Sequence, residues 1–204
     1  MIVFRAILVW LALAGIVVAA VIETAGSEYL QYRGAVYVVA GFAGVMALVL
    51  LLFQPLLASG YLPGLSMSSE RRMHRCVGVA LLLAVTVHVS GLWITSPPDM
   101  VDAMTFRAPT AFSVFGVVAM WALVTSAFLA GFRGKLRFRP QVWRLAHTSS
   151  AIAVVSGTVA HVIMIEGTMG TLSKNLMCTV LVGALALTVR RLRPWVGVWR
   201  AAEK

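Results

Sequence analysis

The four histidines of the chain form two pairs with the same spacing. Thirteen residues separate His74 from His88, and thirteen separate His147 from His161. On a helix, fourteen steps complete almost four turns, so both members of a pair lie on one face, about 21 Å apart along the axis. Because imidazole nitrogens bind metals and carry protons, the repeated spacing indicates two matched sites shared by two helices.

The elements that carry these histidines are apolar runs. The chain is 60% hydrophobic and 12% charged, whereas about a quarter of a soluble domain is charged. A run of about 20 apolar residues crosses a hydrocarbon core about 30 Å thick. Because backbone amides in lipid must pair within their own segment, each run is predicted to be a helix. The six predicted spans cover about residues 2–22, 35–57, 76–94, 110–131, 145–165 and 176–189.

The expected fold class is therefore all-α and integral to a membrane, with one domain over residues 1–204 folded as a six-helix bundle. The first run also admits an alternative interpretation, a signal peptide with Arg5 in its charged region and a cleavage site at Val18-Ala19-Ala20. Its apolar stretch exceeds the 7–15 residues usual for a signal peptide, which favours a membrane span.

The cations are distributed unequally between the two sides of these spans. Cytoplasmic loops carry the excess of Lys and Arg, and fourteen of the seventeen cations fall on one side. Both termini are therefore predicted to be cytoplasmic, in a multi-pass protein of a bacterial inner membrane. The cations stand in short clusters between apolar runs rather than on one folded face, so no nucleic-acid partner is expected. The fourteen are Arg5, Arg71, Arg72, Arg75, Arg133, Lys135, Arg137, Arg139, Arg144, Arg190, Arg191, Arg193, Arg200 and Lys204.

With this topology the third and fifth helices both run outward, so His74 is level with His147 and His88 with His161. An imidazole in lipid is costly without a partner, and two facing imidazoles can ligate one haem iron from both sides. The prediction is two stacked b-type haems between the third and fifth helices. His74 and His147 hold the inner haem iron, and His88 and His161 hold the outer one.

Other readings of the histidines remain open. A membrane histidine also serves as a hydrogen-bonded interface residue or in a proton relay. Zinc or non-haem iron suits the pattern less well, because no cysteine or carboxylate joins either level. Cys76 and Cys178 form neither a CxxC nor a CxxCH motif, so a covalently attached haem is not indicated.

One small residue lies one helical turn from each histidine; these residues are Gly78, Ala84, Ala151 and Gly157. Such residues let a wide macrocycle approach the backbone, and Gly78 and Gly157 are candidate haem contacts. Close packing of membrane helices explains them equally well.

Several cations lie near the predicted haem levels and are candidates to pair with haem propionates. For the inner haem the main candidates are Arg75 and Arg144, with Arg71 and Arg72 nearby, although a purely topogenic role explains each of them. At the outer level the candidates are Arg107 and Lys174. Glu166, Asp99 and Asp102 are candidates for attracting cations on the outer side, although a solvated loop explains them more simply.

The chain resembles the ferric-reductase-like transmembrane family, which includes ferric reductases, NADPH oxidases and the haem subunit of bacterial methionine-sulfoxide reductase systems. The resemblance covers most of the chain and rests on a six-helix core and on RRMHRCVGVALLLAVTVHVSG and WRLAHTSSAIAVVSGTVAHV. Cytochrome b of respiratory complexes is similar in spacing, but its histidines fall on the second and fourth helices of a longer chain.

The resemblance implies electron transfer through two b haems by an oxidoreductase. Many relatives carry a flavin and nicotinamide module, but this chain continues only about fifteen residues beyond its sixth span, without a Gly-rich dinucleotide loop. The expected donor is therefore a separate cytoplasmic flavoprotein or membrane quinol. Ferric iron or a ferric chelate is the first expected acceptor, a periplasmic reductase such as a methionine-sulfoxide reductase is the alternative, and a non-redox scaffold is a distant third.

Overall fold

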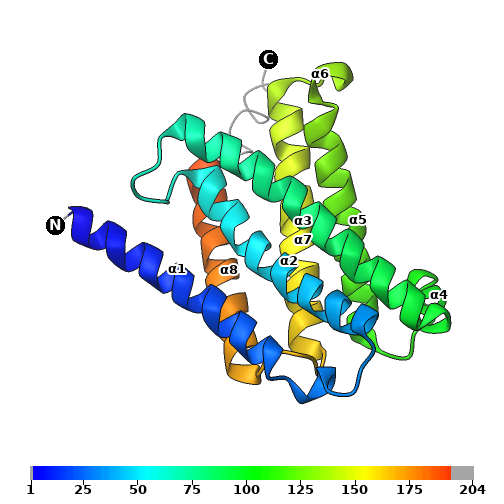
Figure 1. The fold of residues 1–204 in the computed structure, drawn as a ribbon. Helices are drawn as coiled ribbons and strands as arrows, with labels where there is room; N and C mark the ends of the chain where they lie inside the picture. The colour runs from blue at the N-terminus through cyan, green and yellow to red at the C-terminus, as the bar shows by residue number, and fades with distance from the viewer. Residues whose placement is uncertain (1, 194–204) are drawn as a thin grey trace.

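The computed structural model describes residues 2–193, and these residues form helices joined by short connections. Figure 1 shows the long helices side by side as a bundle, with α1 leaning away from the others at its N-terminal end. The elements in chain order are α1 (Ile2–Ala25), η1 (Glu28–Leu30), α2 (Ala35–Ser59), α3 (Met67–Thr95), α4 (Pro97–Met104), α5 (Ala111–Gly131), α6 (Arg133–Leu136), α7 (Pro140–Met164) and α8 (Thr171–Leu192).

Six of these helices are long and apolar enough to cross a membrane, namely α1, α2, α3, α5, α7 and α8. The chain is a multi-pass membrane protein with six candidate spans, and the predicted number and order of spans are confirmed. Arg200 and Lys204, which contributed to the predicted orientation, lie outside the described residues.

Three helices begin before the apolar runs that predict their spans, because apolarity marks the hydrocarbon depth and not the helix end. The third span was expected to begin at residue 76, but α3 begins at Met67. The side chain of Ser66 caps it by accepting a hydrogen bond from Ser69 N at 3.2 Å. Pro140 likewise starts α7 before residue 145, and α8 starts at Thr171 rather than 176.

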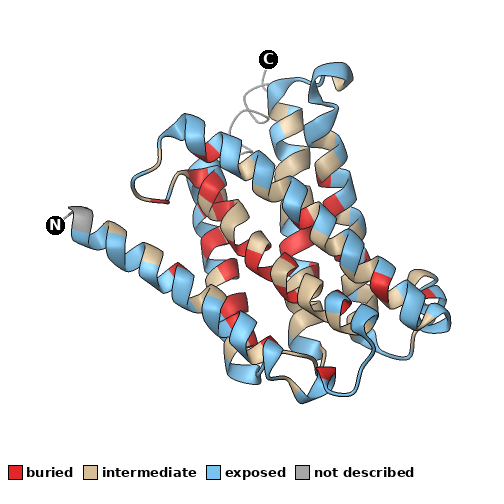
Figure 2. Ribbon diagram, in the orientation of Figure 1, coloured by how far each residue is buried: buried red, intermediate tan, exposed pale blue. Residues whose placement is uncertain are grey.

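Burial is concentrated on α2, while the outward faces of the bundle remain apolar and exposed (Figure 2). Leucines on α1 such as Leu8 and Leu11 are 49% and 63% exposed. A soluble protein would bury such side chains, so these faces are suited to lipid.

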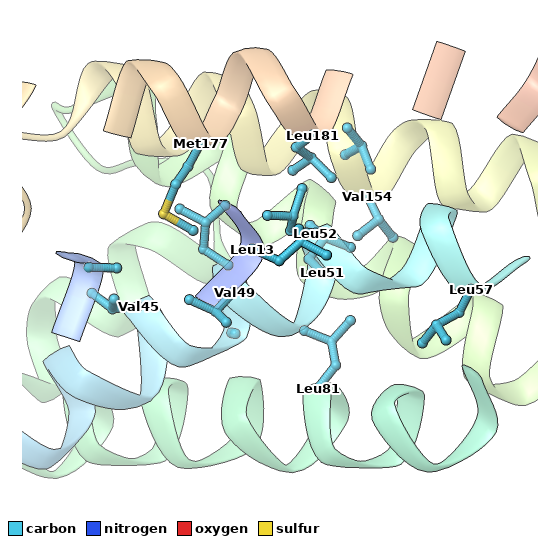
Figure 3. Close-up of a cluster of buried hydrophobic side chains, with 14 of the residues drawn as sticks. Leu13, Val45, Val49, Leu51, Leu52, Leu57, Leu81, Val154, Met177 and Leu181 are labelled. Carbon is cyan, nitrogen blue, oxygen red and sulfur yellow. The ribbon is translucent and has the colours of Figure 1, made fainter. Parts of the chain in front are cut away.

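The core lies where α2 meets its neighbours (Figure 3). Leu51 and Leu52 of α2 share a buried cluster with Leu81 of α3, Val154 of α7 and Leu181 of α8. Burying a leucine side chain stabilises a fold by roughly 1.5–3 kcal/mol when the alternative is water. In lipid that gain is absent, so close packing holds these helices together.

Two helix pairs within the bundle pack most closely, α2 with α3 and α5 with α7. By contrast, α3 and α7 are not among the closely packed helix pairs within residues 2–193. Each histidine-bearing helix therefore packs against its own supporting helix, α3 against α2 and α7 against α5.

Candidate functional site

The first histidine pair comes together across the space between α3 and α7. The ring centroids of His74 and His147 are 6.5 Å apart, with an angle of 74° between the planes. These residues are 73 positions apart in sequence, yet their rings face each other. We call His74 and His147 the inner pair.

The second pair lies further along the same two helices. His88 lies on α3 and His161 on α7, each fourteen residues beyond the histidine of the inner pair. Both are partly buried in the described structure. We call His88 and His161 the outer pair.

On α3, each histidine is held by a backbone carbonyl of α2. Nδ1 of His88 donates a hydrogen bond to the carbonyl oxygen of Ala40 at 2.8 Å. Nδ1 of His74 donates to the carbonyl oxygen of Gln54 at 3.2 Å. The amide Nε2 of Gln54 donates in return to the carbonyl oxygen of His74 at 3.3 Å. Both imidazoles of α3 are therefore oriented by hydrogen bonds from Nδ1 to carbonyl oxygens of α2.

On α7, the supporting helix is α5. Nδ1 of His161 donates to the carbonyl oxygen of Phe112 at 2.9 Å. Nδ1 of His147 shares a 3.1 Å hydrogen bond with Oγ of Ser126. All four histidines thus use Nδ1 to bond the supporting helix, which leaves Nε2 of each ring for another partner.

Two glycines that the sequence analysis missed lie against the outer pair. A Cβ added to Gly44 on α2 would lie 2.8 Å from Nδ1 of His88. A Cβ added to Gly116 on α5 would lie 2.8 Å from Nδ1 of His161. No side chain fits at these two positions while the rings stay where they are, since real Cβ contacts are longer. Gly44 and Gly116 therefore leave the space that the rings of His88 and His161 occupy.

The sequence-predicted glycines have different neighbours. A Cβ on Gly157 would lie 2.9 Å from the carbonyl oxygen of Phe115 and 3.0 Å from Cβ of Ala119, both on α5. The nearest atom to a Cβ on Gly78 would be Nε2 of Gln54 at 3.7 Å. These contacts favour helix packing, the second of the two explanations offered for Gly78 and Gly157.

Three of the predicted cationic contacts are exposed, and the fourth is buried and hydrogen-bonded. Arg75 and Arg144 are exposed at the inner end of the histidine helices, as is Arg107 at the outer end. Lys174 is buried, and its Nζ donates to the carbonyl oxygen of Ile165 at 2.8 Å. Because this ammonium is bonded to the last turn of α7, its role in the structure is to hold that helix end.

The donor set fits a metal held between two imidazoles. A metal–imidazole bond is about 2 Å long and a ring centre lies about 1 Å from its nitrogen, so two axial imidazoles have centres about 6 Å apart. The 6.5 Å separation of the inner pair agrees with this arrangement. Metal-bound histidines also almost always donate the second ring N–H to a carbonyl or similar acceptor, as three of these histidines do to carbonyls.

No group of three or more His, Cys, Asp or Glu side chains suited to a metal ion occurs within residues 2–193. A compact zinc or non-haem iron site in that part of the chain would need such a group. Ligation by two imidazoles alone is the arrangement that haem iron accepts, because the macrocycle supplies the other ligands.

One family model matches the central part of the chain. The family model described as ferric reductase like transmembrane component matches residues 43–158, which is more than half of the chain. The matched region contains His74, His88 and His147, and it ends three residues before His161. No curated protein and no solved structure matches the chain. The resemblance inferred from the histidine-bearing segments is thus confirmed, and the chain belongs to the ferric reductase like transmembrane component family.

Proposed function

We propose that this protein transfers electrons across the membrane through two b haems, each held by one histidine from α3 and one from α7. Its family implies transmembrane electron transfer and typically binds haem b. The inner pair would hold one haem and the outer pair the other. Bound in this way, the haems supply two one-electron carriers at different depths in the bilayer.

The observation that carries the proposal is the common hydrogen bonding of all four imidazoles. Nδ1 of His74 and His88 is bonded to α2, and Nδ1 of His147 and His161 to α5. This bonding fixes the tautomer at three rings that face a carbonyl, so that Nε2 carries the lone pair. The protein's own contribution is to orient these rings through the neighbouring helices α2 and α5.

An iron held by two of these histidines would have no open position for oxygen, which would favour electron transfer over oxygen binding. The oxidant must therefore accept electrons at the outer end rather than bind the iron. We propose ferric iron or a ferric chelate as this acceptor. Asp99, Asp102 and Glu166 are exposed on the side that carries the outer pair, where carboxylates attract a trivalent cation.

The proposed donor is on the cytoplasmic side, and the clustered Lys and Arg residues near the inner pair support that orientation. A periplasmic reductase is the alternative acceptor and would use the same residues. A ferric chelate and a purified reductase domain can be offered separately to the same preparation, which distinguishes the two.

The test uses proteoliposomes of known orientation, with a reductant enclosed on the cytoplasmic face and a membrane-impermeant ferric chelate outside. The wild-type protein is expected to reduce the chelate. His88→Ala should leave the inner haem reducible while chelate reduction collapses, and His74→Ala should leave both the outer haem and the chelate oxidised. Equal chelate reduction by wild type and His88→Ala would remove the outer pair from the path and overturn the proposal.

A further inference from the structure

The inner pair is connected to the protein surface by a stack of side chains. Trp143 precedes His147 by one turn of α7, and the two rings stack with centroids 5.0 Å apart and planes within 9°. The indole Nε1 donates a hydrogen bond to the carbonyl oxygen of Leu129 at 2.9 Å. Trp143 is therefore fixed both by its histidine neighbour and by α5, so its ring orientation and that of His147 are set together.

A cation covers this indole. The guanidinium carbon of Arg133, in the short helix α6, lies 4.3 Å from the centroid of the Trp143 ring. Such a cation over the face of an indole is attracted by the ring electrons. Arg133 is exposed and Trp143 is partly buried, so the stack runs from solvent through Arg133 and Trp143 to His147, and His74 faces His147 at 6.5 Å.

The surface around this stack carries one sign of charge. Residues 132–147 contain five cations and no acidic residue. All five cations are exposed. We call this set the basic surface; its members are Arg133, Lys135, Arg137, Arg139 and Arg144.

A basic surface beside a membrane serves either phospholipid headgroups or an acidic protein partner. Headgroup binding requires only that arginines reach the interface, and it gives no reason for Arg133 to cover a ring that stacks on a histidine of the inner pair. Docking of a redox partner does give a reason, because the partner must come close to that pair. A single-sign patch also raises the association rate of an oppositely charged partner.

We propose that the basic surface is the docking site for an acidic, soluble flavin protein, and that Trp143 is the contact through which its electron reaches the inner pair. The inference rests on the proposed function, since it requires electrons to enter at this end. In the step, the reduced flavin would lose one electron, and the ferric iron that His74 and His147 would hold would accept it. The proton that the flavin loses goes to solvent, and no group is transferred.

The experiment uses the full-length, haem-loaded protein in nanodiscs of zwitterionic lipid, with reduced flavodoxin as the acidic donor. Stopped-flow absorbance gives the second-order rate of haem reduction, and a separate binding measurement gives the salt dependence of flavodoxin association. Reduced methyl viologen, a small cation, serves as the second reductant. The variants are Arg133→Gln, Trp143→Leu and Trp143→Phe.

The chain offers matched controls at the other end of the bundle and on its lipid face. Arg33 lies 5.0 Å over the Tyr37 ring, the same kind of contact as Arg133 makes, so Arg33→Gln is the charge control. Trp121 is 57% exposed on α5, so Trp121→Leu is the tryptophan control. Haem content and the visible spectrum of every variant verify that the inner pair is intact.

Arg133→Gln is expected to slow reduction by flavodoxin about fivefold or more at low salt and to weaken its binding, with little change for methyl viologen. Trp143→Leu should slow reduction by flavodoxin while binding is retained, and Trp143→Phe should restore most of the rate. Both controls should behave as wild type.

Three outcomes would overturn the inference. Wild-type rates with flavodoxin in Trp143→Leu and Arg133→Gln would show that electrons enter elsewhere. A second set of nanodiscs contains anionic lipid. If Arg133→Gln weakens flavodoxin binding only in that set, and not in zwitterionic nanodiscs, the basic surface is assigned to headgroups. An equal loss in Arg33→Gln would show a general charge effect. A wild-type protein that binds no haem would instead defeat the proposed function, so the two failures are distinguishable.

Discussion

The carbonyl oxygen of Ala40 accepts a 2.8 Å hydrogen bond from Nδ1 of His88, and one turn later Gly44 leaves the space that the His88 ring fills. The same arrangement recurs on the other half of the bundle, where Phe112 and Gly116 receive His161. Each outer histidine is thus held by a carbonyl and a glycine of a neighbouring helix. The position of the rings is a property of helix pairs and not of α3 or α7 alone.

Replacing Gly44 with alanine is expected to displace His88 and release the outer haem. The new Cβ would lie 2.8 Å from Nδ1 and 2.9 Å from Cε1 of the ring, and overpacking of this kind costs about 1–3 kcal/mol. Pyridine haemochrome assay should show the haem content falling from two per chain toward one.

The matched control for this variant is Gly78→Ala, whose Cβ would meet Nε2 of Gln54 at an ordinary 3.7 Å. It should keep both haems. If Gly44→Ala kept both haems as well, the space left by Gly44 would not be needed to position His88. If Gly78→Ala lost the inner haem, the sequence-based prediction that Gly78 touches the cofactor would gain support.

Ser126→Ala tests the one Nδ1 partner that is a side chain. Removing Oγ takes away the 3.1 Å hydrogen bond to Nδ1 of His147, and loss of such a partner typically weakens metal binding about 10–100-fold. The inner haem should therefore dissociate more readily to an apo-haem acceptor, while the outer haem is unchanged. Thr125→Ala is the control, because Oγ1 of Thr125 bonds only its own helix at Trp121 O; identical haem loss from both variants would contradict the assigned role of Ser126.

Single substitutions of the four histidines should sort into two classes. His74→Ala and His147→Ala are expected to remove the same component of the reduced-minus-oxidised spectrum, because their rings face each other at 6.5 Å. His88→Ala and His161→Ala should both remove the other component. Removal of one and the same component by His74→Ala and His161→Ala would show that the levels are wrongly assigned.

Both termini are expected in the cytoplasm, because fourteen of seventeen cations fall on that side of six spans. A C-terminal fusion to a reporter that fluoresces only in the cytoplasm should be bright, and a fusion at residue 107 to a periplasmically active phosphatase should be active. Phosphatase activity at the C-terminus instead would reverse the inner and outer assignments.

The sequence predicts the spans well because lipid imposes a simple rule of length and apolarity, and all six predicted spans correspond to helices. The equal spacing of both pairs also predicts that His74 and His147 share a level, and the proximity of their rings agrees with that prediction. The helix starts at Met67 and Thr171 were missed because polar first turns extend beyond the apolar runs.

The supporting contacts could not be predicted in the same way. Ala40 and Phe112 act through backbone carbonyls, which any residue carries, so their side chains give no signal. Gln54 and Ser126 are polar residues within apolar spans, and that was a usable signal. Gly44 could be distinguished from other membrane glycines only when its neighbour, His88, was known.

The central claim is that each histidine pair holds one b haem, and haem stoichiometry in the purified wild-type protein tests it most directly. The measurement combines a pyridine haemochrome assay with a dithionite-reduced minus oxidised spectrum, normalised to polypeptide by amino-acid analysis. The account predicts close to two noncovalent, low-spin haem b groups per chain. A stoichiometry of one would leave one of the two pairs without its proposed role, and a colourless protein that takes up no added haemin would contradict the account altogether.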